Sequence, residues 1–109
     1  MSNYSRNEVV LVRYPFSDLS SAKIRPAVIV NTYHLSNDVF ILPLTSKKTS
    51  LQIGEFVLKS WQQAGLNVET VVKRGIYTIH QDLILQRVGK LSDSDIKELD
   101  NALRLWLGL

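Results

Sequence analysis

Cysteine is absent from this sequence of 109 residues, which excludes disulfide bonds and metal sites built on thiolates. The two histidines, His34 and His80, have no pair of carboxylates nearby, so a histidine-rich metal site is not indicated either. Long apolar runs are also missing, which argues against a membrane-spanning helix or a signal-peptide core. We therefore expect a soluble cytoplasmic protein that needs no metal or other cofactor.

The net charge of +3 is modest, but its distribution along the chain is uneven. Residues 1–91 hold eleven Lys and Arg against six Asp and Glu, a net charge of +5, whereas residues 92–109 hold two against four. A polyanion such as nucleic acid is a plausible partner for the basic part, although mild basicity is also common in proteins that bind none.

The chain is long enough for a single domain, which we place over residues 1–109 with a frayed polar tail at 1–7. Seven runs rich in β-branched and aromatic residues, at 9–14, 27–32, 39–44, 54–58, 68–73, 77–79 and 83–88, are candidates for strands, and we expect five or six short strands among them. Pro43 lacks the amide hydrogen of a central ladder, so the third strand should end, bulge or lie at an edge there.

A C-terminal helix is predicted over residues 92–107. Ser92 is a good N-cap with Asp95 three residues later, and Gly108 ends the helix. Ile96, Leu99, Leu103 and Trp106 or Leu107 share one face, as in a helix that packs on a core. The absence of helical patterns between the strands favours a small, strongly bent antiparallel barrel or sandwich that the helix caps.

Arg25 stands out because it comes directly before Pro26 and a run of β-branched residues. A residue before proline is restricted to extended backbone, so the guanidinium should leave the chain at a defined angle. A planar guanidinium can grip two oxygens of one phosphate, and we therefore interpret Arg25 as a phosphate-binding residue. A structural ion pair with Asp18 or Glu55 is the alternative.

Five segments of the sequence closely resemble the MazF/PemK-like toxins of bacterial toxin–antitoxin systems. They are Phe16–Leu19, Lys23–Val30, Leu42–Ser46, Val88–Ser92 and Leu107–Leu109. The resemblance extends from about Glu8 to the C-terminus. It implies an SH3-like barrel, a homodimer, an antitoxin partner with an acidic and partly disordered segment, and cleavage of single-stranded RNA at selected sequences without a metal.

Metal-free cleavage of RNA is easiest when its own 2′-hydroxyl attacks the phosphate. The reaction then needs a proton acceptor, a proton donor for the leaving oxygen, and positive charge at the developing phosphorane. Arg25 supplies the charge. Thr45 matches the second catalytic position of the family, where a hydroxyl contacts the phosphate or orients the 2′-hydroxyl, although a turn cap at the strand end is its plainer role.

Further residues near these two are candidates for binding the RNA. Hydroxyl and ammonium groups could bind successive phosphates of the RNA backbone, and aromatic rings could stack on its bases. The candidates are Ser20, Lys23, Ser46, Lys47, Lys48, Phe16 and Tyr77. Lys47 and Lys48 would more commonly form a solvated loop, and most aromatic residues of a small domain belong to its core.

The sequence departs from the family pattern at Tyr77–His80, where many members carry a basic residue and then an acidic one. Histidine side chains in general can transfer protons near neutral pH, so His80 is a third candidate catalytic residue, although a lone histidine is more commonly structural. We expect it to converge with Arg25 and Thr45 on one groove. Two alternatives stay open: a gyrase-poisoning toxin of the same fold, against which the pairing of Arg25 with Thr45 argues, and a catalytically inactive barrel that binds nucleic acid or acts as an adaptor, which the departure at Tyr77–His80 would permit.

Overall fold

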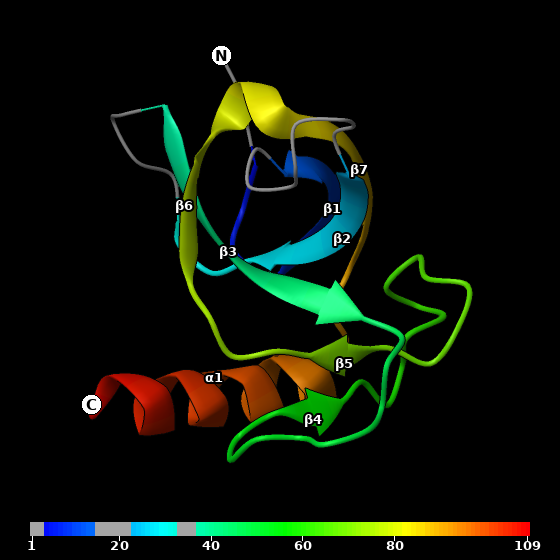
Figure 1. The fold of residues 1–109 in the computed structure, drawn as a ribbon, viewed down its shortest axis with the longest axis vertical. Helices are drawn as coiled ribbons and strands as arrows, with labels where there is room; N and C mark the ends of the chain where they lie inside the picture. Colours follow the sequence, from blue (N-terminus) through cyan, green and yellow to red (C-terminus); the bar gives the residue numbers. More distant parts are fainter. Residues whose placement is uncertain (1–3, 15–22, 33–36) are drawn as a thin grey trace.

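The computed structural model describes residues 4–14, 23–32 and 37–109. It consists of seven short strands, one turn of 3-10 helix and one α-helix (Figure 1). In chain order these are β1 (Glu8–Tyr14), β2 (Lys23–Ile29), β3 (Asp38–Thr45), β4 (Phe56–Val57), β5 (Val71–Val72), β6 (Tyr77–His80), η1 (Gln81–Leu83), β7 (Ile84–Lys90) and α1 (Asp93–Leu107).

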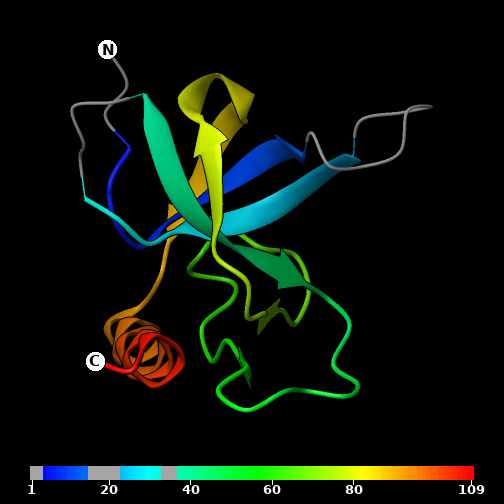
Figure 2. The same ribbon diagram turned by 60° about the vertical axis from the view of Figure 1, so that its left-hand side comes forward.

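All strand pairs are antiparallel and belong to one sheet in the order β4-β5-β3-β2-β1-β7, with β6 paired to β3 outside this path. The sheet bends strongly, and α1 lies beside β4 and β5 (Figures 1 and 2). The terminal strands β4 and β7 do not pair with each other, so the sheet stays open. A mainly β antiparallel fold with a C-terminal helix is therefore confirmed, without full closure of the barrel.

Strand β3 organises the sheet, because it pairs with β2 along one edge and with two strands along the other. The second edge contacts β6 from Asp38 to Ile41 and β5 from Leu44 to Thr45. Pro43 lies between these two partners and forms the last pair with β2, opposite Ala27. A residue without an amide hydrogen thus occupies the position where the ladder changes partners, and the strand continues through it.

Adjacent residues of the central strands point to opposite faces, and both faces are buried. One face packs against α1, where Val9, Val28 and Leu42 meet Leu99 and Leu103. The other face forms a second cluster that includes Val10, Val12, Ala27, Ile29, Val39, Ile41, Ile79 and Ile84. This double burial explains why β1, β2 and β3 contain continuous apolar runs rather than alternating ones.

Helix α1 begins and ends where its capping residues predict. The Ser92 side chain accepts a hydrogen bond from the backbone N–H of Asp95, and Gly108 adopts the left-handed conformation with φ of 70°. Asp95 is fully buried, which its position in the first turn of the helix does not predict. Its carboxylate accepts hydrogen bonds of 2.9 Å from the backbone N–H groups of Lys59 and Ser60, so it fixes the turn at 59–65 to the helix.

Several predicted boundaries differ from the structure. Strand β2 begins at Lys23 and ends at Ile29, so Arg25 lies within the strand instead of before it. The seven strands exceed the expected five or six, and those predicted at 54–58 and 68–73 contain only two residues each. Leu107 is 54% exposed and does not share the buried helix face.

The expectation that residues 1–7 form a frayed tail is wrong for residues 4–7, the part of this segment that the structure describes. The backbone N–H of Asn7 donates to Ile29 O at 2.7 Å, and Asn7 O accepts from Leu91 N at 3.0 Å. Arg6 forms a salt bridge with Asp100 of α1 at 2.8 Å. These contacts extend the domain toward the N-terminus. Within the described ranges, no helix combines the length and apolar character that crossing a membrane requires.

Candidate functional site

Arg25 and Thr45 come from neighbouring strands and lie at the same end of them. The ladder between β2 and β3 ends at the pair Ala27 and Pro43, and Arg25 and Thr45 each lie two residues beyond it. Residues two apart on a strand face the same side. The register of two buried strands therefore brings the two predicted catalytic residues together.

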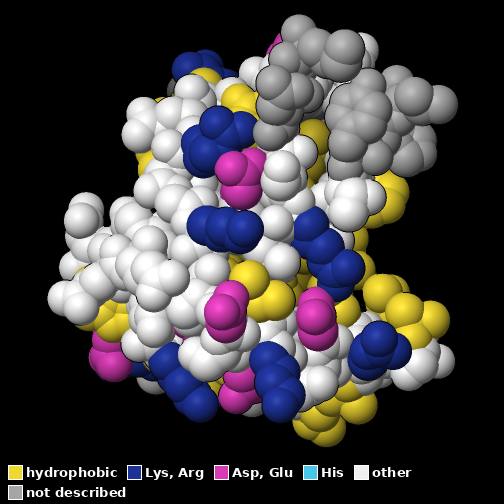
Figure 3. All heavy atoms as spheres, turned by 180° about the vertical axis from the view of Figure 1, so that it is seen from behind, with side chains coloured by type: hydrophobic (Ala, Val, Ile, Leu, Met, Phe, Trp, Pro, Cys, Tyr) yellow, Lys and Arg dark blue, Asp and Glu magenta, His cyan; other side chains and the backbone are white. Residues whose placement is uncertain are grey.

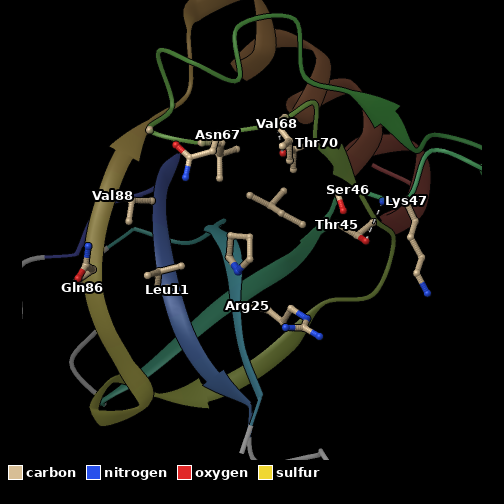
Figure 4. Close-up of a pocket in the computed structure, with 14 residues that line it drawn as sticks. Leu11, Arg25, Thr45, Ser46, Lys47, Asn67, Val68, Thr70, Gln86 and Val88 are labelled. Carbon is tan, nitrogen blue, oxygen red and sulfur yellow. Dashed lines mark hydrogen bonds between the residues drawn. The ribbon is translucent and has the colours of Figure 1, made fainter.

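Both residues line one hollow of about 610 Å³, which we call the groove (Figure 4). Its lining consists of Leu11, Arg25, Pro26, Leu44–Lys47, Gly65–Val68, Thr70, Gln86 and Val88. Arg25 and Lys47 are the charged members of this set, and no carboxylate belongs to it. The described lining therefore favours an anion with an apolar part.

One wall of the groove, residues 65–70, is held against β7 by two glycines. A Cβ on Gly65 would lie 2.0 Å from the carbonyl oxygen of Val88, and a Cβ on Gly89 would lie 2.2 Å from that of Ala64. Gly65 also has a backbone φ of +86°, which residues other than glycine rarely adopt. Direct backbone contact at this point fixes the distance between the wall and the sheet.

Arg25 is exposed and hydrogen-bonds within the described chain only to its neighbour, where its Nη1 donates to Ile24 O at 3.2 Å. The alternative ion pair with Glu55 is not formed, because the Glu55 carboxylate binds Lys73 Nζ at 2.8 Å and Arg74 N at 2.9 Å. Asp18, the other proposed partner, lies outside the described residues. The positive charge of Arg25 is therefore not neutralised by any carboxylate of the described residues.

The Glu55 carboxylate is 2% exposed and joins β4 to the segment after β5. Burial alone would raise its pKa, but hydrogen bonds from Lys73 and from the backbone of Gln52 and Arg74 outweigh this effect and lower the pKa. Glu55 is therefore charged at neutral pH and acts as a structural acceptor.

Thr45 caps the turn that follows β3, since its Oγ1 accepts a hydrogen bond of 3.2 Å from Lys47 N. This contact agrees with the plainer role of a turn cap. It also orients the hydroxyl, whose proton stays available to a ligand because the oxygen serves as the acceptor. Ser46 and Lys47 are exposed and follow Thr45 along the same side of the groove (Figure 4).

The remaining RNA-binding candidates are distributed differently. Lys48 does not line the groove. It forms a salt bridge with Glu69, which joins the two loops that border the groove. Lys23 is exposed at the start of β2, opposite Tyr14. Phe16 and Ser20 lie outside the described residues.

Tyr77 is 41% exposed and contacts Tyr14 edge to face, with ring centroids 6.4 Å apart. Burial, followed by the electrostatic influence of Tyr77, raises the pKa of Tyr14 to about 12, so Tyr14 is neutral at physiological pH. In β1, Tyr14 lies two residues from Val12, the partner of Arg25. The tyrosine pair is therefore close to the Arg25 end of the sheet but outside the groove lining.

His80 does not lie with Arg25 and Thr45. It pairs with Asp38, seven residues from Thr45 along β3, which corresponds to about 23 Å at the usual rise of a strand. Its Nδ1 accepts a hydrogen bond of 3.1 Å from Asp82 N and caps η1. The expected convergence of all three residues on one groove is not observed, and the structure gives His80 a local capping role.

Residues 65–68, Thr70 and the β7 residues Gln86 and Val88 line the groove but were not sequence candidates. Thr70 is 3% exposed, and its hydroxyl donates to Val68 O at 2.9 Å. The Gly65 and Gly89 pair was the available signal, because glycines far apart in a chain can mark a close backbone approach.

On the face that Figure 3 shows, basic and acidic side chains are interspersed. Salt bridges such as Arg6 with Asp100 and Arg87 with Glu8 neutralise part of the basic charge. The described residues also contain no group of three His, Cys, Asp or Glu side chains placed to hold a metal ion. The described lining of the groove holds two cations and no carboxylate, so the groove is positively charged whatever the net charge of the chain.

Comparisons with known proteins agree with this fold. A family model described as PemK-like, MazF-like toxin of type II toxin–antitoxin system matches residues 5–107. A search of curated proteins gave no match.

Three solved structures illustrate the structural similarity. The first is an endoribonuclease in complex with its cognate antitoxin from Mycobacterial species, with 20% identity, TM-score 0.74 and coverage of 100% of this chain and 97% of the other. The second is the Mycobacterium tuberculosis toxin MazF-mt6, with 21% identity, TM-score 0.74 and coverage of 94% and 97%. The third is the MazE–MazF complex from Deinococcus radiodurans, with 13% identity, TM-score 0.78 and coverage of 99% of each chain.

Proposed function

Because the chain belongs to the PemK-like, MazF-like toxins of type II toxin–antitoxin systems, we propose that it is an endoribonuclease. Its substrate is single-stranded RNA, which it cleaves at selected sequences in the cytoplasm without a metal ion. One observation carries this proposal: Arg25, Thr45 and Lys47 line the same groove, and no described lining residue is a carboxylate.

In the proposed reaction the 2′-oxygen of one nucleotide forms a bond to the adjacent phosphorus, and the bond from phosphorus to the 5′-oxygen breaks. The 2′-hydroxyl loses its proton to an acceptor, and the leaving 5′-oxygen gains one. Charge accumulates on the phosphate oxygens as the phosphorane forms. The Arg25 guanidinium stabilises these oxygens through two parallel hydrogen bonds.

Thr45 contributes the second contact. Its Oγ1 is oriented by the bond from Lys47 N, so its O–H can donate to a phosphate oxygen. The Lys47 ammonium adds charge along the path of the RNA backbone. His80 has no part in this scheme, because the strand register places it toward the opposite end of β3.

The proposal includes two partners. Two of the similar structures are toxins bound to their antitoxins, and a groove lined by cations without carboxylates suits an acidic antitoxin segment that competes with RNA. A homodimer is the second expectation. The exposed apolar side chains of Phe40, Ile76, Leu107 and Leu109 surround a hollow of about 320 Å³ and are the surface best suited to the contact.

The test is cleavage of a mixed-sequence single-stranded RNA in the presence of a chelator, with the ends mapped. We expect Arg25→Ala to lower the cleavage rate by about 10²–10³-fold, the usual effect of removing one transition-state contact. Arg13→Ala is the matched control, because Arg13 is exposed on β1 and does not line the groove. Cleavage by Arg25→Ala at the wild-type rate would contradict the assignment.

The same assay separates the alternatives. RNA binding without cleavage would favour the inactive nucleic-acid-binding barrel. Inhibition of DNA supercoiling by purified gyrase, with no RNA cleavage, would favour the gyrase-poisoning toxin.

A further inference from the structure

We propose that the part of the groove between Asn67 and Gln86 is a nucleobase subsite, which holds one unstacked base of the RNA beside the cleaved phosphate. Asn67 and Gln86 determine which base is accepted. The proposal rests on the proposed function and extends it from phosphate chemistry to sequence selection.

The floor of the subsite is apolar and comes from four strands. Leu11, Pro26, Leu44 and Val88 supply it, and Leu11 pairs directly with Pro26 on one side and with Gln86 on the other. A phosphate gains nothing from such a floor, whereas the flat face of a base packs well on aliphatic groups. Ligand sites of this kind commonly combine an apolar lining with a few polar groups that fix orientation.

The two side-chain amides are available to a ligand. Asn67 and Gln86 are exposed, line the groove and make no side-chain hydrogen bond within the described chain. Each amide offers both donors and an acceptor, which matches the edge of a base, where donors and acceptors alternate. A phosphate has only acceptors and would leave the amide oxygens unpaired.

The wall that carries Asn67 is held in place before any ligand binds. The buried Thr70 hydroxyl donates to Val68 O at 2.9 Å within this wall. The backbone contact of Gly65 with Val88 anchors its beginning. A fixed wall loses little conformational entropy on binding, so its amide can discriminate between bases.

The residues that would bind phosphate and the two side-chain amides lie on opposite sides of the groove. Thr45, Ser46 and Lys47 lie along one side with Arg25 below them, and Asn67, Gln86 and Val88 lie opposite (Figure 4). A nucleotide whose phosphate contacts Arg25 therefore extends its base toward the amides. Single-stranded RNA presents its bases in this way, since they are free to leave the stack.

The first experiment compares cut-site distributions on a mixed-sequence RNA. We expect Asn67→Ala and Gln86→Ala to relax the preference at one position next to the cut by roughly tenfold, the typical value of a paired amide contact to a base. Gln63→Ala and Asn101→Ala are matched controls, because both amides are exposed outside the groove lining. Unchanged cut-site distributions in both groove variants would overturn the proposal.

A second experiment measures binding alone, so that the subsite is judged separately from catalysis. Fluorescence anisotropy compares short homopolymers of A, C, G and U on the full chain carrying Arg25→Ala. Adding Gln86→Ala should reduce the differences among the four affinities, and adding Gln63→Ala should not. If the wild type cleaves no RNA but Gln86→Ala still removes base discrimination, the proposed function fails and the subsite stands. Equal affinities for all four homopolymers would refute the subsite, whatever the cleavage activity.

Discussion

The buried carboxylates and the polar groups that face the groove differ in how far the protein itself satisfies their hydrogen bonds. Away from the groove lining, the Asp95 and Glu55 side chains are buried: Asp95 accepts hydrogen bonds from the backbone of Lys59 and Ser60, and Glu55 accepts one from Gln52 N in its own loop and one from Arg74 N after β5. Facing the groove, Asn67 and Gln86 make no side-chain hydrogen bond within the described residues, and Arg25 bonds only to an adjacent carbonyl. The first group holds segments without strand pairing in place, and the second is left for a ligand. Substitutions should therefore separate stability from activity.

The largest loss of stability should follow Asp95→Ala. The change leaves the backbone N–H groups of Lys59 and Ser60 without their acceptor, and we expect the free energy of unfolding to fall by about 3 kcal/mol. Urea denaturation measures this. Asp93→Ala is the control, because Asp93 is exposed in the same helical turn and should change stability by less than about 1 kcal/mol. Similar losses in both variants would show that the helix dipole, and not the buried acceptor, dominates.

Glu55→Gln should lower the free energy of unfolding by less, about 2 kcal/mol at pH 7, because the amide oxygen of glutamine still accepts some of the hydrogen bonds. Contacts with Lys73 and the backbone lower the pKa of Glu55 below its ordinary value of 4.5. Its contribution is therefore fully present above pH 4.5 and is lost as the pH falls through the lowered value. Unfolding free energies at pH 7 and pH 3 should show the difference between wild type and variant shrinking in acid. A difference that stays constant would mean that charge on Glu55 does not contribute.

The smallest effect is expected from Glu69→Gln, which releases Lys48 from its surface salt bridge. Exposed salt bridges contribute little to stability, so the free energy of unfolding should change by less than about 0.5 kcal/mol. RNA affinity should rise about twofold to threefold at low salt and return to the wild-type value at high salt.

Titrations of Glu69→Gln at two salt concentrations test this, with Asp82→Asn as the control because Asp82 is 84% exposed beside His80. An equal gain in the control would indicate a general effect of net charge. In that case Lys48 would have no particular place on the RNA path.

The sequence predicted those parts of the molecule that depend on local interactions. Strand β1 and both ends of α1 follow from neighbouring residues, because apolar runs, the Ser92 cap and the left-handed Gly108 need no tertiary information. Arg25 and Thr45 were recognised by resemblance, and their common position on the groove follows from one strand register.

Long-range geometry could not be predicted in the same way. Lys23 and Arg25 are charged and give no apolar run, so the strand at Lys23–Arg25 depends on pairing with β1. His80 was placed with the site by its chemistry, yet the register of β6 on β3 decides its location. Residues 65–70 reach the groove through the contact between Gly65 and β7, for which no local pattern is sufficient.

The glycine contact between residues 65 and 89 also has an evolutionary consequence. It fixes where the wall begins, while Asn67, Val68 and Glu69 beyond it are exposed and belong to neither core cluster. Mutations at these three positions can therefore change what the groove accepts without disturbing the fold, whereas the two glycines cannot vary. A chain built in this way can diversify its target sequences through a few surface changes, with the Arg25 and Thr45 pair left in place.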